Sequence, residues 1–244
     1  MRWILLRGLA REQAHWGAFR QQLATAFPGH QFHTVDLPGT GVHFKEASPT
    51  TIADIRACVQ RQVQHIPRPY GLIALSLGGM VALDWAQQAQ EGEIQQLVLI
   101  NTSSGFSPPW QRMKPTAWPQ LLRLLARREL FRRESDILAL SSNRPVAVQT
   151  AKQWYSIQRQ RPVTAPNALR QIAAAARFRP ASQRPLPDAL LLASQHDRLV
   201  DWRCSRALER RWQWTLKVHP DAGHDLPLDD ADWVIRQLRA FCLE

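Results

Sequence analysis

The sequence is poor in cysteine and has no long hydrophobic run, and both absences limit what the protein can be. Its 244 residues include three cysteines, Cys58, Cys204 and Cys242, which lie far apart. An odd number of scattered cysteines excludes a disulfide framework and a cysteine zinc cluster, so a reduced, cytoplasmic setting is expected. No apolar run reaches the roughly 18 residues that a membrane-spanning helix needs, and the apolar stretch after Met1 is too short for a signal peptide.

Metal-ligand patterns are missing as well. The eight histidines show no spacing such as H-E-x-x-H, so no metal or organic cofactor is expected. What the chain does have is apolar material, at 45% of its residues, with 21% charged. That composition supports one ordinary domain with a buried core.

Positive charge is concentrated in one part of the chain. The formal net charge is +11, yet residues 111–184 alone hold fifteen Lys or Arg against three acids. Two interpretations stay open: a basic patch for an anionic partner, or a solvated, arginine-rich helical face. Nucleic acid has no support as the partner, because no nucleic-acid recognition motif accompanies the basic segment.

Short apolar runs alternate with helical patterns along most of the chain. The predicted strands are 2–6, 31–36, 72–75, 96–100, 189–193 and 215–218. The predicted helices are 15–26, 51–65, 78–90 and 230–243. Such alternation predicts an α/β fold, with a mostly parallel sheet covered by helices on both faces.

The strand signal disappears between Ser103 and Pro187. This stretch is rich in Leu, Ala, Arg and Gln and is punctuated by prolines, which predicts an insertion of three or four helices. We therefore expect a core formed by residues 1–103 and 188–244, with a helical lid at 104–187. The insertion follows the fourth core strand, where it could cover the end of the sheet that carries an active site.

Ser76 joins a predicted strand to a helix in the stretch Ala74-Leu75-Ser76-Leu77-Gly78. The usual form of this turn is G-x-S-x-G, which pushes the serine hydroxyl out at the top of the sheet. Alanine at the first position is small enough to keep the turn plausible. A serine beside glycines can also be an ordinary helix cap, so the motif needs partners before it predicts catalysis.

A serine nucleophile needs a base and an acid, which follow it in the chain in the order acid, then histidine. His224 lies in a loop after the last predicted strand, whereas its competitor His219 lies at the strand's end. Asp197 lies in the loop after the preceding strand and would hold the imidazole. Its competitors are Asp201 and, less favoured because it is so close to His224, Asp221.

An oxyanion formed by attack on a carbonyl needs two backbone N–H groups. Leu77, directly after the serine, supplies the first. We choose Leu9, in the loop after the first strand, for the second, because Gly8 lets the backbone turn close to the substrate. The alternative interpretation of Leu9 is a core residue.

Together these residues resemble the α/β-hydrolase superfamily over nearly the whole chain. Within it, the chain is similar to the carboxylesterases that remove the methyl group from pimeloyl-acyl carrier protein methyl ester in biotin biosynthesis. Four stretches carry the similarity: 35–41 after the second strand, 75–82 at the serine, 103–115 where the lid begins, and 137–141 within the lid. The chain departs from that family at Arg7, where histidine is usual, and at Ala74, where glycine is usual.

The resemblance implies substrate contacts and a partner. The implied substrate-binding residues are Leu9, Ser76, Leu77, Ile137, Leu138, Ala139, Leu140, Ser141 and His224. In that family lid arginines meet an acidic carrier protein, which would account for the basic lid, and Arg132 and Arg133 lie closest to the matching stretch.

Three functions follow from the sequence. The first is a serine carboxylesterase acting on acyl or methyl esters, with or without a carrier protein. The second is a thioesterase or acyltransferase using the same triad, because only the leaving group or acceptor differs. The third is a non-catalytic binder on a hydrolase fold, which the intact triad disfavours.

Overall fold

A computed structural model describes residues 1–145 and 147–243 of the chain. One six-stranded sheet has the order β2-β1-β3-β4-β5-β6, and every neighbouring pair is parallel. The strands are β1 (Arg2–Leu6), β2 (Gln31–Val35), β3 (Tyr70–Leu75), β4 (Ile94–Ile100), β5 (Leu190–Ser194) and β6 (Thr215–His219). The predicted parallel sheet is confirmed, with each strand within two residues of its predicted bounds.

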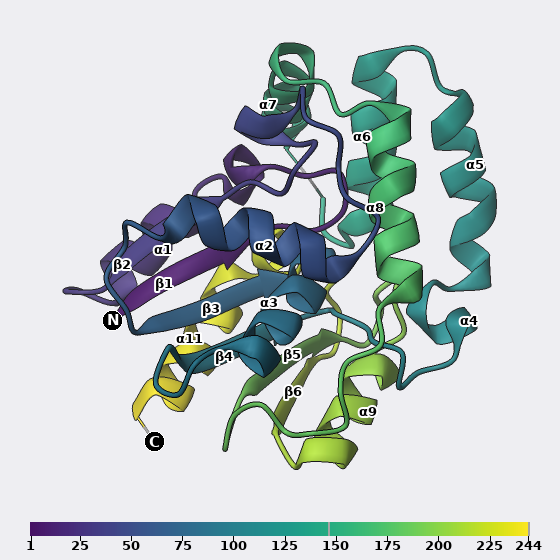
Figure 1. Ribbon diagram of the computed structural model, residues 1–244. Coiled ribbons are helices and arrows are strands. Elements are labelled where there is room, and N and C mark those ends of the chain that lie inside the picture. Colours follow the sequence, from purple (N-terminus) through teal and green to yellow (C-terminus); the bar gives the residue numbers. More distant parts are fainter. Residues whose placement is uncertain (146, 244) are drawn as a thin grey trace.

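Helices cover both faces of the sheet (Figure 1). Side chains alternate along each strand, so Ile4 and Leu6 of β1 join one buried cluster while Trp3 and Leu5 join the other. The first cluster packs under α2 (Ile52–Val63), α3 (Leu77–Gln88) and α9 (Arg203–Trp212), and the second under α1 (Phe19–Ala26) and α11 (Ala231–Leu243). Within the described residues, no helix combines the length and apolar character needed to cross a membrane.

The predicted helix 15–26 is wrong in its first turns. The chain forms a 3-10 turn at Gln13–Trp16 and begins α1 only at Phe19. Gly17 between them has φ = 52°, a left-handed conformation that glycine adopts without a steric penalty and that ends a right-handed helix.

The segment between β4 and β5 is helical, as predicted, but it contains more helices than three or four. Within the described residues these are α4 (Pro109–Arg112), α5 (Trp118–Ala126), α6 (Leu130–Ser141), α7 (Val148–Gln160) and α8 (Ala165–Arg177), plus a 3-10 turn at Pro115–Ala117. Proline lies in the first turn of several of them, where its missing N–H costs nothing. Each such proline lies where a new helix starts.

Buried polar contacts hold the inserted helices against the core. Arg11, in the loop after β1, pairs with Glu134 of α6 at 2.7 Å, and both side chains are buried. Glu12 in the same loop accepts hydrogen bonds from Arg161, after α7. The Gln171 amide of α8 bonds backbone groups in the loops after β1 and β2. The helices therefore stand beyond the carboxyl ends of the strands, as Figure 1 shows for α6 and α8.

Candidate active site

The strand order changes direction between β1 and β3, because β2 lies on one side of β1 and β3 on the other. Such a switch point opens a crevice at the carboxyl ends of the strands, and ligands of open α/β sheets bind there. Gly8 after β1 and Ser76 after β3 meet at this point. A β-carbon on Gly8 would lie only 3.1 Å from that of Ser76, so the loop that continues into Leu9 lies against the predicted nucleophile.

Ser76 occupies a strained turn between β3 and α3. Its φ of 56° and ψ of −117° are sparsely populated by non-glycine residues and cost about 1–3 kcal/mol. Gly78 makes the turn possible, since a β-carbon there would lie 2.6 Å from two carbonyl oxygens at the end of β1. The Ser76 N–H donates to the Ile100 carbonyl at 2.9 Å, and its carbonyl accepts from the Thr102 hydroxyl at 2.8 Å.

The predicted oxyanion donors flank this turn. Leu77 is the first residue of α3, and N–H groups in the first turn of a helix have no partner within the helix. Leu9 is half-buried and follows Gly8. The chain thus places both backbone segments near the Ser76 turn.

Asp197 and His224 form a hydrogen-bonded pair although 27 residues separate them. Nδ1 of His224 lies 2.7 Å from Oδ2 of Asp197, and the Asp197 side chain is 1% exposed. The other carboxylate oxygen accepts the backbone N–H groups of Leu199 and Val200 at 2.7 and 3.0 Å. With its carboxylate fixed, Asp197 selects the imidazole tautomer that donates from Nδ1, which leaves Nε2 free to accept a proton.

Charge around His224 outweighs its burial. Burial alone lowers the pKa of an imidazole. The Asp197 carboxylate, its hydrogen bond and the neighbouring Asp225 act in the opposite direction, and together they raise the pKa of His224 above 6.5, with Arg7 opposing them. The site therefore stabilises the imidazolium that forms when His224 accepts a proton.

Asn101, at the end of β4, holds the histidine loop and was not predicted from the sequence. Its amide nitrogen donates to the His224 carbonyl at 2.8 Å, and its oxygen accepts from the Ser194 N–H at 2.8 Å. The residue has φ = 44°, a conformation that asparagine adopts more readily than most residues. Ser76 bonds Ile100, the last residue of β4, so Ile100 and the residue directly after it, Asn101, fix the serine turn and the histidine loop.

Arg7 and Asp225 form a buried ion pair that the sequence also did not reveal. Two guanidinium nitrogens contact the two carboxylate oxygens at 3.1 and 2.5 Å, and each side chain is 3% exposed. The guanidinium also lies 4.9 Å from the Trp16 ring centroid. Arg7 precedes Gly8 and Asp225 follows His224, so this pair ties the loop after β1 to the histidine loop.

The competing residues are engaged elsewhere. His219 pairs with Asp230 at 3.2 Å, and Asp201 pairs with Arg203 at 3.2 Å. The Asp221 backbone N–H bonds the His219 ring. None of the three takes part in the hydrogen bond between Asp197 and His224.

The predicted substrate-binding stretch 137–141 forms the end of α6. The Ser141 carbonyl accepts from the Asp225 N–H at 2.8 Å, and the Ala139 carbonyl accepts from Arg198 at 2.6 Å. Leu138 and Leu140 are buried. This end of α6 therefore lies against the loops that carry His224 and Asp197.

The predicted partner-binding arginines lie earlier in α6, and each has an acidic neighbour. Arg132 pairs with Glu129 at 2.8 Å and is 68% exposed. Arg133 approaches Glu134 at 3.7 Å and is 31% exposed. Arg132 thus keeps an accessible guanidinium on the surface.

The described residues include no group of three or more His, Cys, Asp or Glu side chains arranged to hold a metal ion. The three cysteines are unpaired, and burial raises the pKa of Cys204 to about 11. A thiol with that pKa is protonated at neutral pH and is a poor nucleophile.

The sheet order, the serine turn and the histidine loop after β6 define an α/β hydrolase. The chain belongs to the alpha/beta hydrolase family, whose model matches residues 3–237. Among solved structures, an esterase from Exiguobacterium antarcticum aligns over 100% of this chain and 92% of its own, with a TM-score of 0.81 and 14% identity. A membrane phospholipase A aligns over 99% of this chain and 78% of its own, with a TM-score of 0.76 and 19% identity. At these identities the similarity shows the fold alone.

Three curated relatives share a more specific name. The pimeloyl-[acyl-carrier protein] methyl ester esterase of Chromobacterium violaceum is 31% identical over 116 residues, covering 48% of this chain and 40% of the relative. The protein of the same name from Vibrio cholerae is 31% identical over 115 residues, covering 46% and 42%. The matched segments thus span about two fifths of these relatives.

Proposed function

We propose that the protein is a serine carboxylesterase. The observation that carries the proposal is the buried hydrogen bond between His224 and Asp197. Asn101 holds the His224 loop at the carboxyl end of the sheet, where Ser76 occupies its strained turn. A buried carboxylate that orients a histidine, with a serine in a strained turn at the same end of the sheet, is the arrangement expected to activate a hydroxyl nucleophile.

In this mechanism the Ser76 hydroxyl attacks the ester carbonyl while Nε2 of His224 takes its proton. The N–H groups of Leu77 and Leu9 stabilise the oxyanion. The tetrahedral intermediate collapses, His224 protonates the departing alcohol, and an acyl-enzyme ester remains on Ser76. Water, activated by the same histidine, then attacks this ester and releases the acid.

We further propose that residues 104–187 act as a lid and that the substrate is an acyl methyl ester carried by an acyl carrier protein. The name of the curated relatives supports this substrate class. The end of α6, 137–141, would line the acyl chain, because it contacts the His224 loop. The exposed Arg132, with Arg133, would meet the acidic carrier.

Ester hydrolysis tests the reaction class. We expect turnover of p-nitrophenyl esters from C2 to C12, with the preferred chain length reporting the depth of the acyl site. Thioesters of the same acyl chains serve as the comparison. Faster turnover of the thioesters at every chain length would contradict the proposed carboxylesterase activity and indicate a thioesterase.

Charge reversal tests the carrier. Arg132→Glu with Arg133→Glu is expected to lower kcat/KM on a carrier-linked methyl ester by about tenfold or more, since each reversed charge weakens long-range attraction. Activity on a p-nitrophenyl ester should not change. The matched control is Arg61→Glu with Arg236→Glu, which reverses two exposed arginines outside the insertion. Equal losses on both substrates, or equal losses in the control, would contradict a role in carrier binding. The basic side chains of the insertion would then form only a solvated surface.

The pH dependence of hydrolysis follows from the raised pKa of His224. Only neutral imidazole can accept the Ser76 proton, so kcat/KM rises with pH through the pKa of the free enzyme. Because nearby carboxylates raise this pKa, the acid limb is expected to have its midpoint above 6.5. A pH profile with a p-nitrophenyl ester measures it, and a midpoint below 6.5 would contradict the electrostatic assignment.

A further inference from the structure

The exposed face of α9 lines an arginine-rich cleft of about 750 Å³. Arg203, Arg206, Ala207 and Arg210 line it, and their i, i+3, i+4, i+7 spacing places them on one side of the helix. The opposite side buries Leu208 in the core. With Arg211, which also lines the cleft, the helix thus presents four guanidinium groups to one hollow.

The charged side chains that line this cleft are all basic. None of its lining residues is acidic. Arg203 and Arg206 each have one acidic neighbour, at 3.2 and 3.7 Å. In the part of the chain that the structure describes, Arg210 and Arg211 have none within 4.0 Å. The uncompensated positive charge therefore favours an anionic occupant.

Ser107 forms part of the wall of this cleft and is 5% exposed. Its neighbour is the Cys204 thiol: burial raises the pKa of that thiol, and its hydrogen bond with Ser107 lowers it. Ser107 therefore closes the wall, and the arginines of α9 supply the accessible donors of the cleft.

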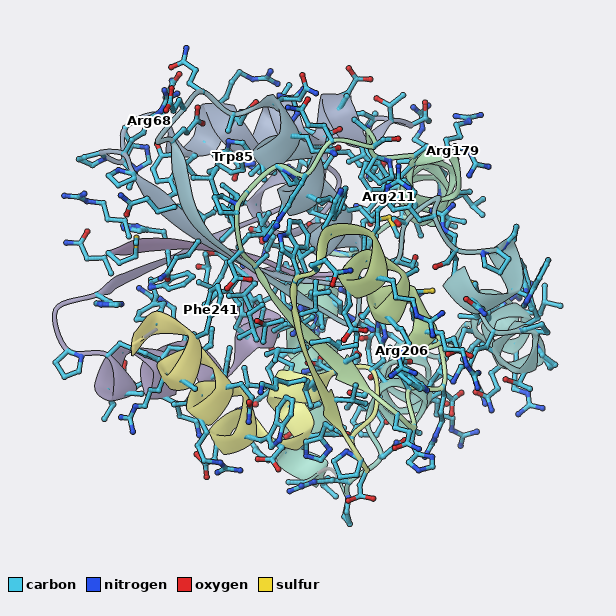
Figure 2. The ribbon with its side chains drawn as sticks, turned by 90° about the horizontal axis from the view of Figure 1, so that it is seen from below. Arg68, Trp85, Arg179, Arg206, Arg211 and Phe241 are labelled. Atoms are coloured by element: carbon cyan, nitrogen blue, oxygen red, sulfur yellow. The ribbon has the colours of Figure 1, made fainter. Side chains whose placement is uncertain are left out.

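Packing contacts and a hydrogen bond hold two arginines around the cleft in place. The Arg211 guanidinium lies 4.4 Å from the Phe106 ring centroid, and Phe106 packs edge-on against Trp212 at 5.4 Å. Arg179 donates to the Gly105 carbonyl at 3.1 Å, beside Phe106. In Figure 2 Arg179, Arg206 and Arg211 lie toward the same side of the molecule, away from Arg68.

We propose that this cleft binds a small phosphorylated molecule, with its phosphate held by Arg206, Arg210 and Arg211. Guanidinium forks match phosphate oxygens in geometry and charge, and the volume falls within the range of about 300–1,000 Å³ typical of small-molecule sites. The site contains none of the proposed catalytic residues, so it does not depend on the proposed esterase activity.

Isothermal titration with inorganic pyrophosphate tests this site in the 244-residue chain. Saturable binding to one site per chain is expected. Arg210→Gln with Arg211→Gln should weaken it about tenfold or more, as lost charge-assisted hydrogen bonds predict. Arg61→Gln with Arg236→Gln is the matched control and should leave binding unchanged. ADP provides a second arm: tighter binding than pyrophosphate indicates an organic phosphate, and equal binding indicates free diphosphate.

The absence of saturable pyrophosphate binding to the wild type would overturn the proposal. An equal loss in the control pair would also overturn it, because it would assign binding to diffuse net charge. Ester hydrolysis by the Arg210→Gln, Arg211→Gln variant should match the wild type. This separates failure of the phosphate site from failure of the proposed esterase.

Discussion

Ser76→Ala is expected to lower kcat for ester hydrolysis by a factor on the order of 10⁶, the loss seen when the nucleophile of a serine triad is removed. Without the hydroxyl no acyl-enzyme forms. The variant should fold normally, because the backbone contacts of Ser76 to Ile100 and Thr102 do not involve the hydroxyl. Steady-state hydrolysis of a p-nitrophenyl ester and a thermal melt measure the two effects.

Ser48→Ala is the matched control for this change, since it removes one serine hydroxyl at a buried position outside the site. It should retain activity. If Ser76→Ala hydrolyses esters at the wild-type rate, the assignment of the nucleophile fails. If it loses activity only by unfolding, its melting temperature will fall while that of Ser48→Ala stays near the wild type.

Arg7→Met is expected to lower stability by about 3–5 kcal/mol, because it leaves the Asp225 carboxylate buried without a partner. Replacing both partners, as Arg7→Met with Asp225→Leu, should recover most of this loss, since apolar pairs of similar volume often replace buried ion pairs at little cost. Chemical denaturation measures both. A stable single variant would contradict the buried pair.

Activity should not recover in the same way. The pair joins the loop after β1 to the histidine loop, so the double variant is expected to fold yet to lose about 10²-fold in kcat through misplaced groups. The single variants should also shift the acid limb in opposite directions. Arg7 lowers and Asp225 raises the pKa of His224, so Arg7→Met moves the midpoint up and Asp225→Asn moves it down. A purely structural pair would give no opposite shifts.

Most of the fold could be predicted from local patterns in the sequence. The six strands were predictable because their apolar runs are short, continuous and bounded by turn residues, and the same alternation identified the helices on the two faces. The number of inserted helices could not be predicted, because one-turn segments such as α4 contain too few residues to show a helical period. The break at Gly17 was missed because glycine is also tolerated within a helical pattern.

The residues of the candidate site could be predicted only in part, because some of them are far apart in the sequence and meet only in the folded chain. Ser76, Asp197 and His224 are predictable from their positions after β3, β5 and β6, and the structure brings Asp197 and His224 into contact. Arg7 and Asp225 are 218 residues apart, and no local pattern links two such residues. The arginine cleft was also missed, because it combines α9 with residues after β4 that lie about a hundred positions earlier.

Covalent labelling tests the central claim most directly. A p-nitrophenyl phosphonate ester mimics the tetrahedral intermediate and reacts with an activated serine. The account predicts one adduct per chain on Ser76 by peptide mass mapping, with release of p-nitrophenol, no adduct in Ser76→Ala and slower labelling in Asp197→Asn. An adduct on another residue, or undiminished labelling of Ser76→Ala, would contradict it.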